Sequence, residues 1–207
     1  MPPTDRNRGW VIPLVVCALL ICAGCSTRPS STDGLVLGSA PATGLRITAQ
    51  IYAGVLRHAG ARVADDLRTR DEAGLLDEVA TGRLDLFPTF TGDALTSLTP
   101  PSSVASATAS PTPSGADDGV DARYVALNES LPQGVTAGDA TPVRDDAGDS
   151  LVPVYRSAVL SREQVRAVNQ VAGELTTADL EAMVTSVDSG RTDTTQAAST
   201  WLGEHGL

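Results

Sequence analysis

The sequence predicts an α/β fold in which a mixed, mostly parallel sheet is flanked by helices. Strand-like and helix-like patterns alternate through residues 35–98, and this alternation is typical of strands joined by helical crossovers. A Pro-, Ser- and Ala-rich stretch, residues 99–120, interrupts the pattern. An apolar strand at residues 149–157 and three amphipathic helices complete the chain, which gives enough apolar sequence for one compact unit.

The elements of the first segment follow from the spacing of its apolar residues. An apolar run that ends in turn residues predicts a strand, and apolar residues three and four apart predict one face of a helix. A glycine just after such a face predicts the helix end. The expected order is a strand at 35–40, a helix at 43–60, a strand at 61–68, a helix through Leu75 and Val79 that stops at Gly82, and a strand at 84–87.

Two of the few aromatic residues, Phe87 and Phe90, lie three apart at the end of the last of these strands. Pro88 between them cannot donate a backbone hydrogen bond, so we expect the strand to stop there. Thr91 is expected to cap a following helix, with Asp93 in its first turn, where a carboxylate suits the helix dipole. Packing gains least from rings at a turn, so the use of scarce aromatic residues here needs an explanation.

The composition changes after this helix. Residues 99–120 lack the apolar surface that would order them, and we expect a disordered insert. Order is expected to resume in residues 121–150 with a short helix and a turn. Residues 151–207 then supply a strand and the C-terminal helices that complete the unit begun by residues 35–98.

Each of the three C-terminal helices has a recognisable start. Ser161 and Gln164 have the spacing of a capping box, which predicts the first helix. The second is expected to begin near Thr177. The third should begin at Asp193, which again has a glutamine three residues on, and should end at Gly206.

The N-terminus resembles that of a bacterial lipoprotein. Residues 1–24 read as a signal peptide, because two arginines precede an apolar run that is shorter than the about 20 residues of a spanning helix. Ala-Gly-Cys before Ser26 resembles a lipobox, which predicts lipid on Cys25 and a tether at 25–34. Cys22 stands where that motif usually has an aliphatic residue, so an ordinary signal peptide or an uncleaved anchor stays open. The expected location is the extracytoplasmic face of the cell membrane, with the chain held by lipid.

The charge balance argues against one class of partner. The chain has no lysine, and its 15 basic residues stand against 25 acidic ones, for a net charge of −10. Binding to nucleic acid needs clustered basic side chains that neutralise phosphates. We therefore expect no nucleic-acid partner.

Catalytic and metal-binding patterns are also missing from the sequence. His58 and His205 have no Cys, Asp or Glu partner at the spacing of metal ligands. The paired aspartates at 65–66, 117–118 and 145–146 are read as solvated loop charges, since adjacent residues rarely share a proton. The sequence predicts no metal, no cofactor and no enzymatic activity.

Several stretches resemble the substrate-binding proteins of ABC transporters for glycine betaine, choline and carnitine. Residues 38–95 look like the first lobe of that family, including its Asp-Leu-Tyr-Pro-Glu-Tyr-Thr-Gly-Thr-Ala-Leu stretch, here DLFPTFTGDAL. Residues 123–146 resemble the segment that follows the first lobe. Residues 151–207 are similar to the family's C-terminal end, with its Val-Pro strand and final Trp-Leu-x-x-x-Gly-Leu. The resemblance implies a single lobe of a type II periplasmic-binding-protein-like fold, in which 121–150 is a vestigial crossover and most of the second lobe is missing.

The resemblance also implies a ligand site at Phe90, Thr91, Asp93 and Tyr155. Phe90 matches an aromatic position that boxes a quaternary ammonium in the family, and a ring face attracts a cation. The alternative explanation is that the Phe90 ring serves only to pack against the rest of the protein. The family has Lys, Glu and Thr where this chain has Ala40, Thr89 and Asp93, and these differences favour a choline-like cation that lacks a carboxylate.

Two functions remain open at this point. The first is a membrane-anchored component of an ABC importer, with a quaternary ammonium ligand and a permease subunit as partners. The second is a diverged lipoprotein that has lost its ligand and interacts with another protein. The short link between Asp149 and the Val152-Pro153 strand favours the second, and the retained first-lobe pattern favours the first.

Overall fold

The computed structural model describes residues 34–99 and 116–207. The expected signal peptide, Cys25, most of the expected tether and residues 100–115 of the expected insert lie outside these ranges. None of the helices within them is long and apolar enough to cross a membrane. The described elements, in chain order, are β1 (Gly38–Ser39), α1 (Thr43–His58), β2 (Arg68–Thr69), α2 (Glu72–Ala80), β3 (Leu86–Phe90), α3 (Thr91–Leu98), α4 (Ala116–Ser130), β4 (Val135–Ala137), β5 (Leu151–Arg156), α5 (Arg162–Glu174), α6 (Thr177–Asp188) and α7 (Thr194–His205).

The strands pair in both directions. β1 and β2 form a short parallel pair, while β3, β5 and β4 form an antiparallel sheet with β5 in the centre. A parallel bridge between Leu37 and Leu86 connects the two sets. The sheet is mixed, as expected, but the prediction that it is mostly parallel is wrong, because both ladders of β5, with β3 and with β4, are antiparallel.

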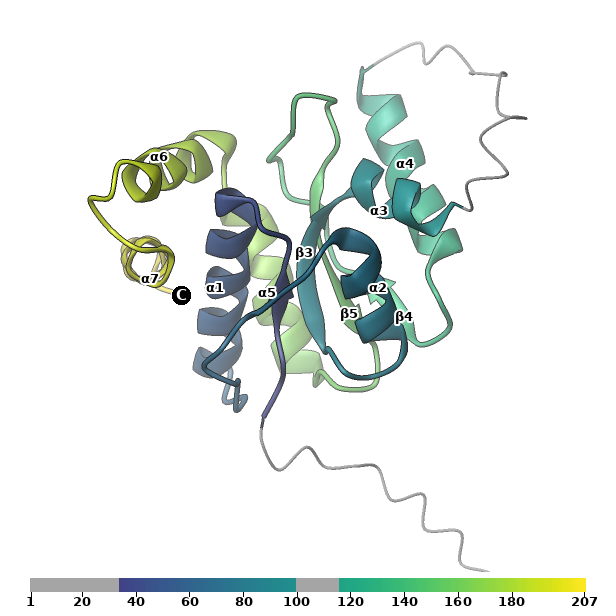
Figure 1. Cartoon of the computed structure of the whole chain (residues 1–207), viewed down its shortest axis with the longest axis horizontal. Helices are drawn as coiled ribbons and strands as arrows, with labels where there is room; N and C mark the ends of the chain where they lie inside the picture. The colour runs from purple at the N-terminus through teal and green to yellow at the C-terminus, as the bar shows by residue number, and fades with distance from the viewer. Residues whose placement is uncertain (1–33, 100–115) are drawn as a thin grey trace, which may run out of the picture. The chain divides into compact units, whose positions relative to one another are not determined.

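Helices cover both sides of this sheet (Figure 1). α1 and α5 lie on one side, and α6 and α7 pack beyond α1. α2, α3 and α4 lie on the other side. Successive residues of an extended strand face opposite ways, so each central strand contributes to two cores. Leu151 and Tyr155 of β5 belong to the core on the α1 side, whereas Val152 and Val154 belong to the core under α2 and α4.

The expected end of the third strand at Pro88 is wrong. β3 continues through Pro88 to Phe90, and Pro88 lies opposite Pro153 of β5. The carbonyl of Pro153 accepts a hydrogen bond from the Gly138 amide on the β4 side, at 2.8 Å. Because both backbone polar groups of an extended residue point the same way, the two prolines form a non-hydrogen-bonded pair, and no amide is needed between β3 and β5 at this position. On the β4 side, where Pro153 has no N–H to donate, the Gly138 carbonyl accepts from the Tyr124 hydroxyl at 3.0 Å.

Two other expected boundaries also need correction. The strand expected at 61–68 is reduced to a bridge at Val63 and to β2. The two exposed aspartates between them form a bend, since Asp is disfavoured in strands. Helix α4 begins at Ala116, inside the stretch expected to be disordered at 99–120. The predicted crossover, residues 121–150, contributes most of α4 and the edge strand β4 to the described unit.

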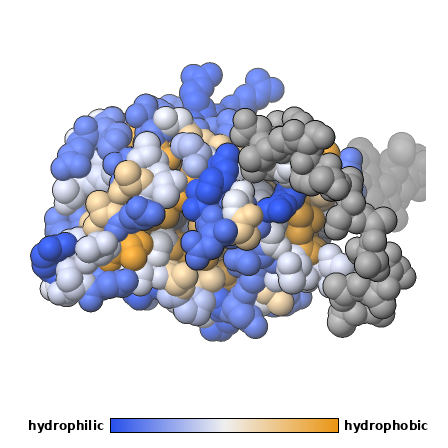
Figure 2. Space-filling view, turned by 90° about the horizontal axis from the view of Figure 1, so that it is seen from above, coloured by the Kyte–Doolittle hydropathy of each residue, from blue (hydrophilic) through white to orange (hydrophobic). Residues whose placement is uncertain are grey.

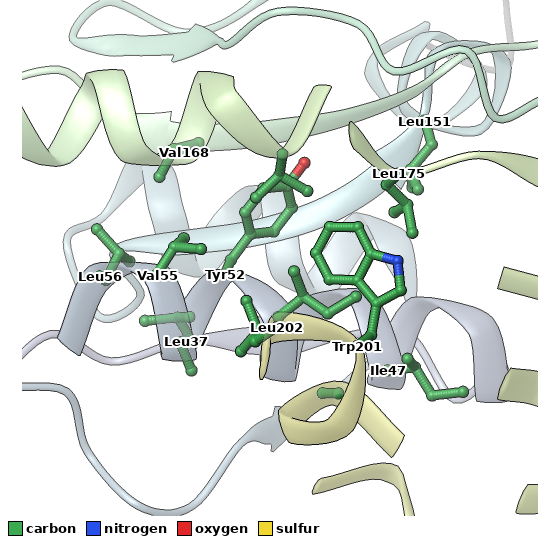
Figure 3. Packing of buried hydrophobic residues seen from close by; sticks show 14 of the residues in the cluster. Leu37, Ile47, Tyr52, Val55, Leu56, Leu151, Val168, Leu175, Trp201 and Leu202 are labelled. Atoms are coloured by element: carbon green, nitrogen blue, oxygen red, sulfur yellow. The ribbon is translucent and has the colours of Figure 1, made fainter. Parts of the chain in front are cut away.

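The C-terminal helices begin as the sequence predicts. Ser161 and Gln164 form the capping box of α5, and Asp193 caps α7 by accepting from the Gln196 amide. Gly206 ends α7 with a φ of 68°, a conformation that favours glycine. Figure 3 shows Trp201 and Leu202 of α7 packed beside residues of α1.

A glycine in α1 allows α7 to approach closely. A Cβ atom at Gly54 would lie 2.2 Å from Cδ1 of Leu202. The two helices therefore meet where one of them has no side chain, and Leu202 fills the space.

Candidate ligand site at the end of β3

Phe90 lies at the point where β3 becomes α3. It is the last residue of the strand and the N-cap position of the helix. Its ring is partly buried and packs against the core on the α1 side of the sheet. The carboxyl ends of strands are the usual place for ligands in open α/β sheets, so Phe90 has the position expected of a ligand-contacting ring.

The structure does not bring Tyr155 to Phe90. Phe90 is opposite Leu151 in the β3–β5 ladder, and Tyr155 is opposite Leu86. The two aromatic residues therefore lie on the same face but four positions apart, about 13 Å along the strands. Tyr155 is also 6 % exposed, and burial raises the pKa of its hydroxyl. A shared aromatic cage of Phe90 and Tyr155 is not formed in this arrangement.

Thr91 does not cap α3 as expected from the sequence. It is the first residue of the helix, and the cap position has no side-chain hydrogen bond. Its buried hydroxyl instead donates to Oδ1 of Asp149 at 3.1 Å and accepts from the Ser150 amide at 3.3 Å. The hydroxyl thus joins the helix to the start of β5. Within the protein it already acts both as a hydrogen-bond donor and as an acceptor.

Asp149 is the centre of this polar group. Its Oδ1 also accepts from Nη1 of Arg123 on α4, at 2.7 Å, and the carboxylate is almost fully buried. A Cβ at Gly92 would lie 2.1 Å from its Oδ2, so the glycine allows the carboxylate to sit against the first turn of α3. A helix N-terminus attracts anions, and here the protein's own carboxylate occupies that position.

More acidic side chains surround the start of α3. Asp93 is exposed in the first turn of the helix, as the sequence predicts, and burial together with Asp145 and Asp149 raises its pKa. Glu72, at the start of α2, lies beside Thr89, the residue before Phe90. Burial, and to a smaller extent its acidic neighbours, raises the pKa of Glu72 to about 7, while the Thr89 hydroxyl partly offsets the rise.

Glu72 has unused hydrogen-bonding capacity. Its Oε1 is buried and has no hydrogen-bond partner. Thr89 and Phe90 face opposite sides of the sheet because they are adjacent in a strand. A ligand that touched both the Phe90 ring and Glu72 would therefore have to lie over the end of β3, not in one of the two cores.

The chemistry of this region suits a cation better than an anion or a zwitterion. The carboxylates of Glu72, Asp93 and Asp149 gather near a partly buried ring, and the neighbouring guanidinium of Arg123 is paired with Asp149. The N-terminus of α3, which would attract a ligand carboxylate, is already occupied by the carboxylate of Asp149. In the described ranges, no three or more His, Cys, Asp or Glu side chains are arranged to hold a metal ion.

Sequence reasoning missed three contributors to this site: Glu72, Arg123 and Asp149. Gly92 gave one local signal, since a glycine in the first turn of a helix allows another group to come close, but it did not identify that group as Asp149. Arg123 and Glu72 come from separate helices, and nothing in their immediate sequence indicates that they meet the end of β3. Asp145 was read as a solvated charge, but it accepts from the amides of Ala147 and Asp149 and closes the turn before β5.

The α/β fold of this chain, in which polar groups gather at the end of β3, has a counterpart among solved structures. The solved structure of apo YehZ from Escherichia coli is similar to this chain, with a TM-score of 0.65 and 11 % sequence identity. The likeness covers 83 % of this chain and 98 % of the YehZ chain. It confirms the fold predicted from the sequence. No protein-family model and no curated protein matches the sequence.

Proposed function

We propose that this protein is the membrane-anchored substrate-binding component of an ABC importer for quaternary amine osmoprotectants of the choline or glycine betaine type. The observation that carries the proposal is the position of Phe90, a partly exposed ring among carboxylates at the end of β3 in a periplasmic-binding-protein fold. In this proposal Cys25 holds the lipid and a permease subunit receives the ligand. The role is one of binding, not catalysis.

The proposed ligand is a cation without a carboxylate. The ring of Phe90 would contribute roughly 0.5–2 kcal/mol through its attraction for a cation, depending on how well the cation is desolvated. Asp93 would add Coulombic attraction, and Glu72 would add to it once its carboxyl ionises, at pH values above its raised pKa of about 7. A carboxylate on the ligand would meet Asp93 and Asp149 and find Arg123 already paired. Choline is therefore expected to bind more tightly than glycine betaine or carnitine.

Isothermal titration of the full chain with choline, glycine betaine and carnitine tests this proposal. Phe90→Ala should weaken choline binding by about tenfold, the equivalent of about 1.4 kcal/mol. Glu163→Gln on α5 is the matched control, since Glu163 is exposed and lies outside the site. Choline binding by Phe90→Ala that equals or exceeds that of the parent chain would contradict the role of the ring.

Asp93→Asn separates the electrostatic contribution from that of the ring. Removing this charge should weaken choline binding and strengthen binding of glycine betaine, because repulsion of the ligand carboxylate is reduced. Equal effects on both ligands would count against the proposed preference.

A diverged lipoprotein without a small-molecule ligand is the second candidate function. The specific observation in its favour is that Asp149, at the helix N-terminus beside the end of β3, is already bonded by Thr91 and Arg123. Tyr155 is also too far along the strand to complete a cage with Phe90. Absence of binding by all three amines up to millimolar concentration would support this role, and a protein partner should then be sought.

A further inference from the structure

A second cavity lies between α6 and α7, away from the end of β3. Its volume is about 310 Å³, near the lower end of the range of roughly 300–1,000 Å³ for small-molecule pockets. Its walls combine an apolar part, from Met183 and the indole of Trp201, with the hydroxyls of Ser186 and Thr200. Figure 2 shows one face of the molecule, on which hydrophilic residues separate small apolar patches.

The charged groups that line this cavity are both acidic. Asp179 belongs to α6 and Glu204 to α7. Neither forms an ion pair with any of the described residues. Hydrogen bonds from Thr176 hold the pKa of Asp179 below its ordinary value, so this group is a carboxylate at neutral pH. Both Thr176 bonds go to Oδ2, which leaves Oδ1 for another donor.

Trp201 adds an unsatisfied donor to the same cavity. The residue is 3 % exposed, and its indole Nε1 is buried without a hydrogen-bond partner. The indole N–H lies near enough to Asp179 to contribute to the lowered pKa of that carboxyl, but it forms no hydrogen bond with it. His205 stacks on one face of the ring at a centroid distance of 4.3 Å, so a ligand would meet the edge of the indole and not that face.

The histidine does not neutralise the cavity carboxylates through a direct contact. His205 Nδ1 lies 2.9 Å from the Trp201 carbonyl, at the end of α7. The cavity therefore offers two carboxylates and a buried N–H donor. A ligand that matches them carries a protonated amine for the carboxylates and a hydroxyl oxygen for the indole N–H.

We propose that the α6–α7 cavity is a second ligand site, separate from the end of β3, which binds a small protonated amino alcohol. The ammonium group donates to Oδ1 of Asp179 and to the Glu204 carboxylate. The hydroxyl oxygen accepts from Nε1 of Trp201 after a small adjustment of the surrounding side chains. The apolar part of the ligand packs on Met183.

Three small probes separate the parts of this ligand. 2-Aminoethanol has both the ammonium and the hydroxyl, ethylamine has the ammonium alone, and ethylene glycol has no charge. Each is titrated into the full chain carrying Trp10→Phe, which makes Trp201 the single tryptophan. The readouts are the indole N–H resonance of Trp201 and its fluorescence. 2-Aminoethanol should shift both saturably, ethylamine should bind about fivefold more weakly, and ethylene glycol should not bind at neutral pH.

Substitutions test whether the binding is located in the cavity. Glu204→Gln should weaken 2-aminoethanol binding by about tenfold, because a charge-assisted hydrogen bond is lost. Glu204 is exposed, so its substitution leaves the fold intact. Glu181→Gln is the matched control on α6, since Glu181 is exposed and outside the cavity. Phe90→Ala should leave this binding unchanged, which distinguishes the cavity from the choline site.

Two results would overturn the proposal. One is a Trp201 resonance that does not move with 2-aminoethanol up to tens of millimolar. The other is a Glu204→Gln variant that binds as tightly as the Glu181→Gln control. Either result is independent of whether choline binds at Phe90.

Discussion

The end of β3 and the pair of helices α6 and α7 use polar side chains in opposite ways. At the end of β3, the buried carboxylate of Asp149 is bonded by Thr91 and Arg123, and most donors there have acceptors within the protein. Between α6 and α7, the buried indole N–H of Trp201 has no partner, and the nearby carboxylates form no ion pair within the described ranges. Buried polar groups that satisfy one another hold a structure together, whereas unpaired groups facing a cavity are available to a ligand.

Asp149→Ala should have the largest effect on stability. It leaves the hydroxyl of Thr91 and the guanidinium of Arg123 without their acceptor, and removing one partner of a largely buried pair is costly. Because Arg123 is partly exposed, we expect a loss of about 2–4 kcal/mol in the free energy of unfolding, measured by urea denaturation. Asp146→Ala, an exposed neighbour, should change it by less than about 0.5 kcal/mol. Equal losses in the two variants would mean that the buried group is not structural.

Glu72 is the exception within the β3 end, since its carboxyl is buried but incompletely bonded. Its folded pKa is raised from 4.5 to about 7, so the folded protein keeps the proton at pH values where the unfolded chain has lost it. Stability from this group is complete below about pH 4.5 and falls as the pH rises to about 7, by up to about 3 kcal/mol.

Glu72→Gln should therefore flatten the pH dependence of unfolding between pH 5 and pH 8 and make the protein more stable at pH 8. Urea denaturation across this range is the measurement, with Glu163→Gln as the exposed control. A pH dependence that survives in Glu72→Gln would assign it to other groups, with Asp93 the first to be examined.

The packing of α7 on α1 provides a test in the other region. Gly54→Ala places a methyl group where Leu202 now lies, and overpacking of this kind costs roughly 1–3 kcal/mol. Gly173→Ala on α5 is the matched control, because a Cβ there meets nothing within 4 Å. That substitution should stabilise the protein by about 0.5–1 kcal/mol through helix propensity. Thermal unfolding of both variants measures the difference, and equal shifts in the same direction would contradict the close approach of α1 and α7.

The smallest expected effect is that of a helix cap. Ser161→Ala removes one half of the capping box of α5 and should cost about 1 kcal/mol. Ser199→Ala is a suitable comparison, because Ser199 is an exposed serine inside α7 and alanine is the better helix former. If both variants were equally stable, the Ser161 hydroxyl would have no capping role.

The features that could be predicted from the sequence alone are local ones. The starts of α5 and α7 depend on hydrogen bonds between residues three apart, as for Ser161 with Gln164 and Asp193 with the Gln196 amide. The end of α7 depends on the backbone freedom of Gly206. Each of these can be read from a few neighbouring residues, because all the atoms involved lie within one helical turn.

The strand pairing and the groups that meet at both sites depend on contacts between segments that are distant in the chain. Pro88 stays within β3 because Pro153, far away in the chain, lies opposite it, and no backbone amide is needed between β3 and β5 at that position. Asp149 reaches the start of α3, and Asp179 and Trp201 share a cavity, because packing brings separate elements together. Contacts of this kind depend on how distant segments pack, and no local spacing of residues encodes that arrangement.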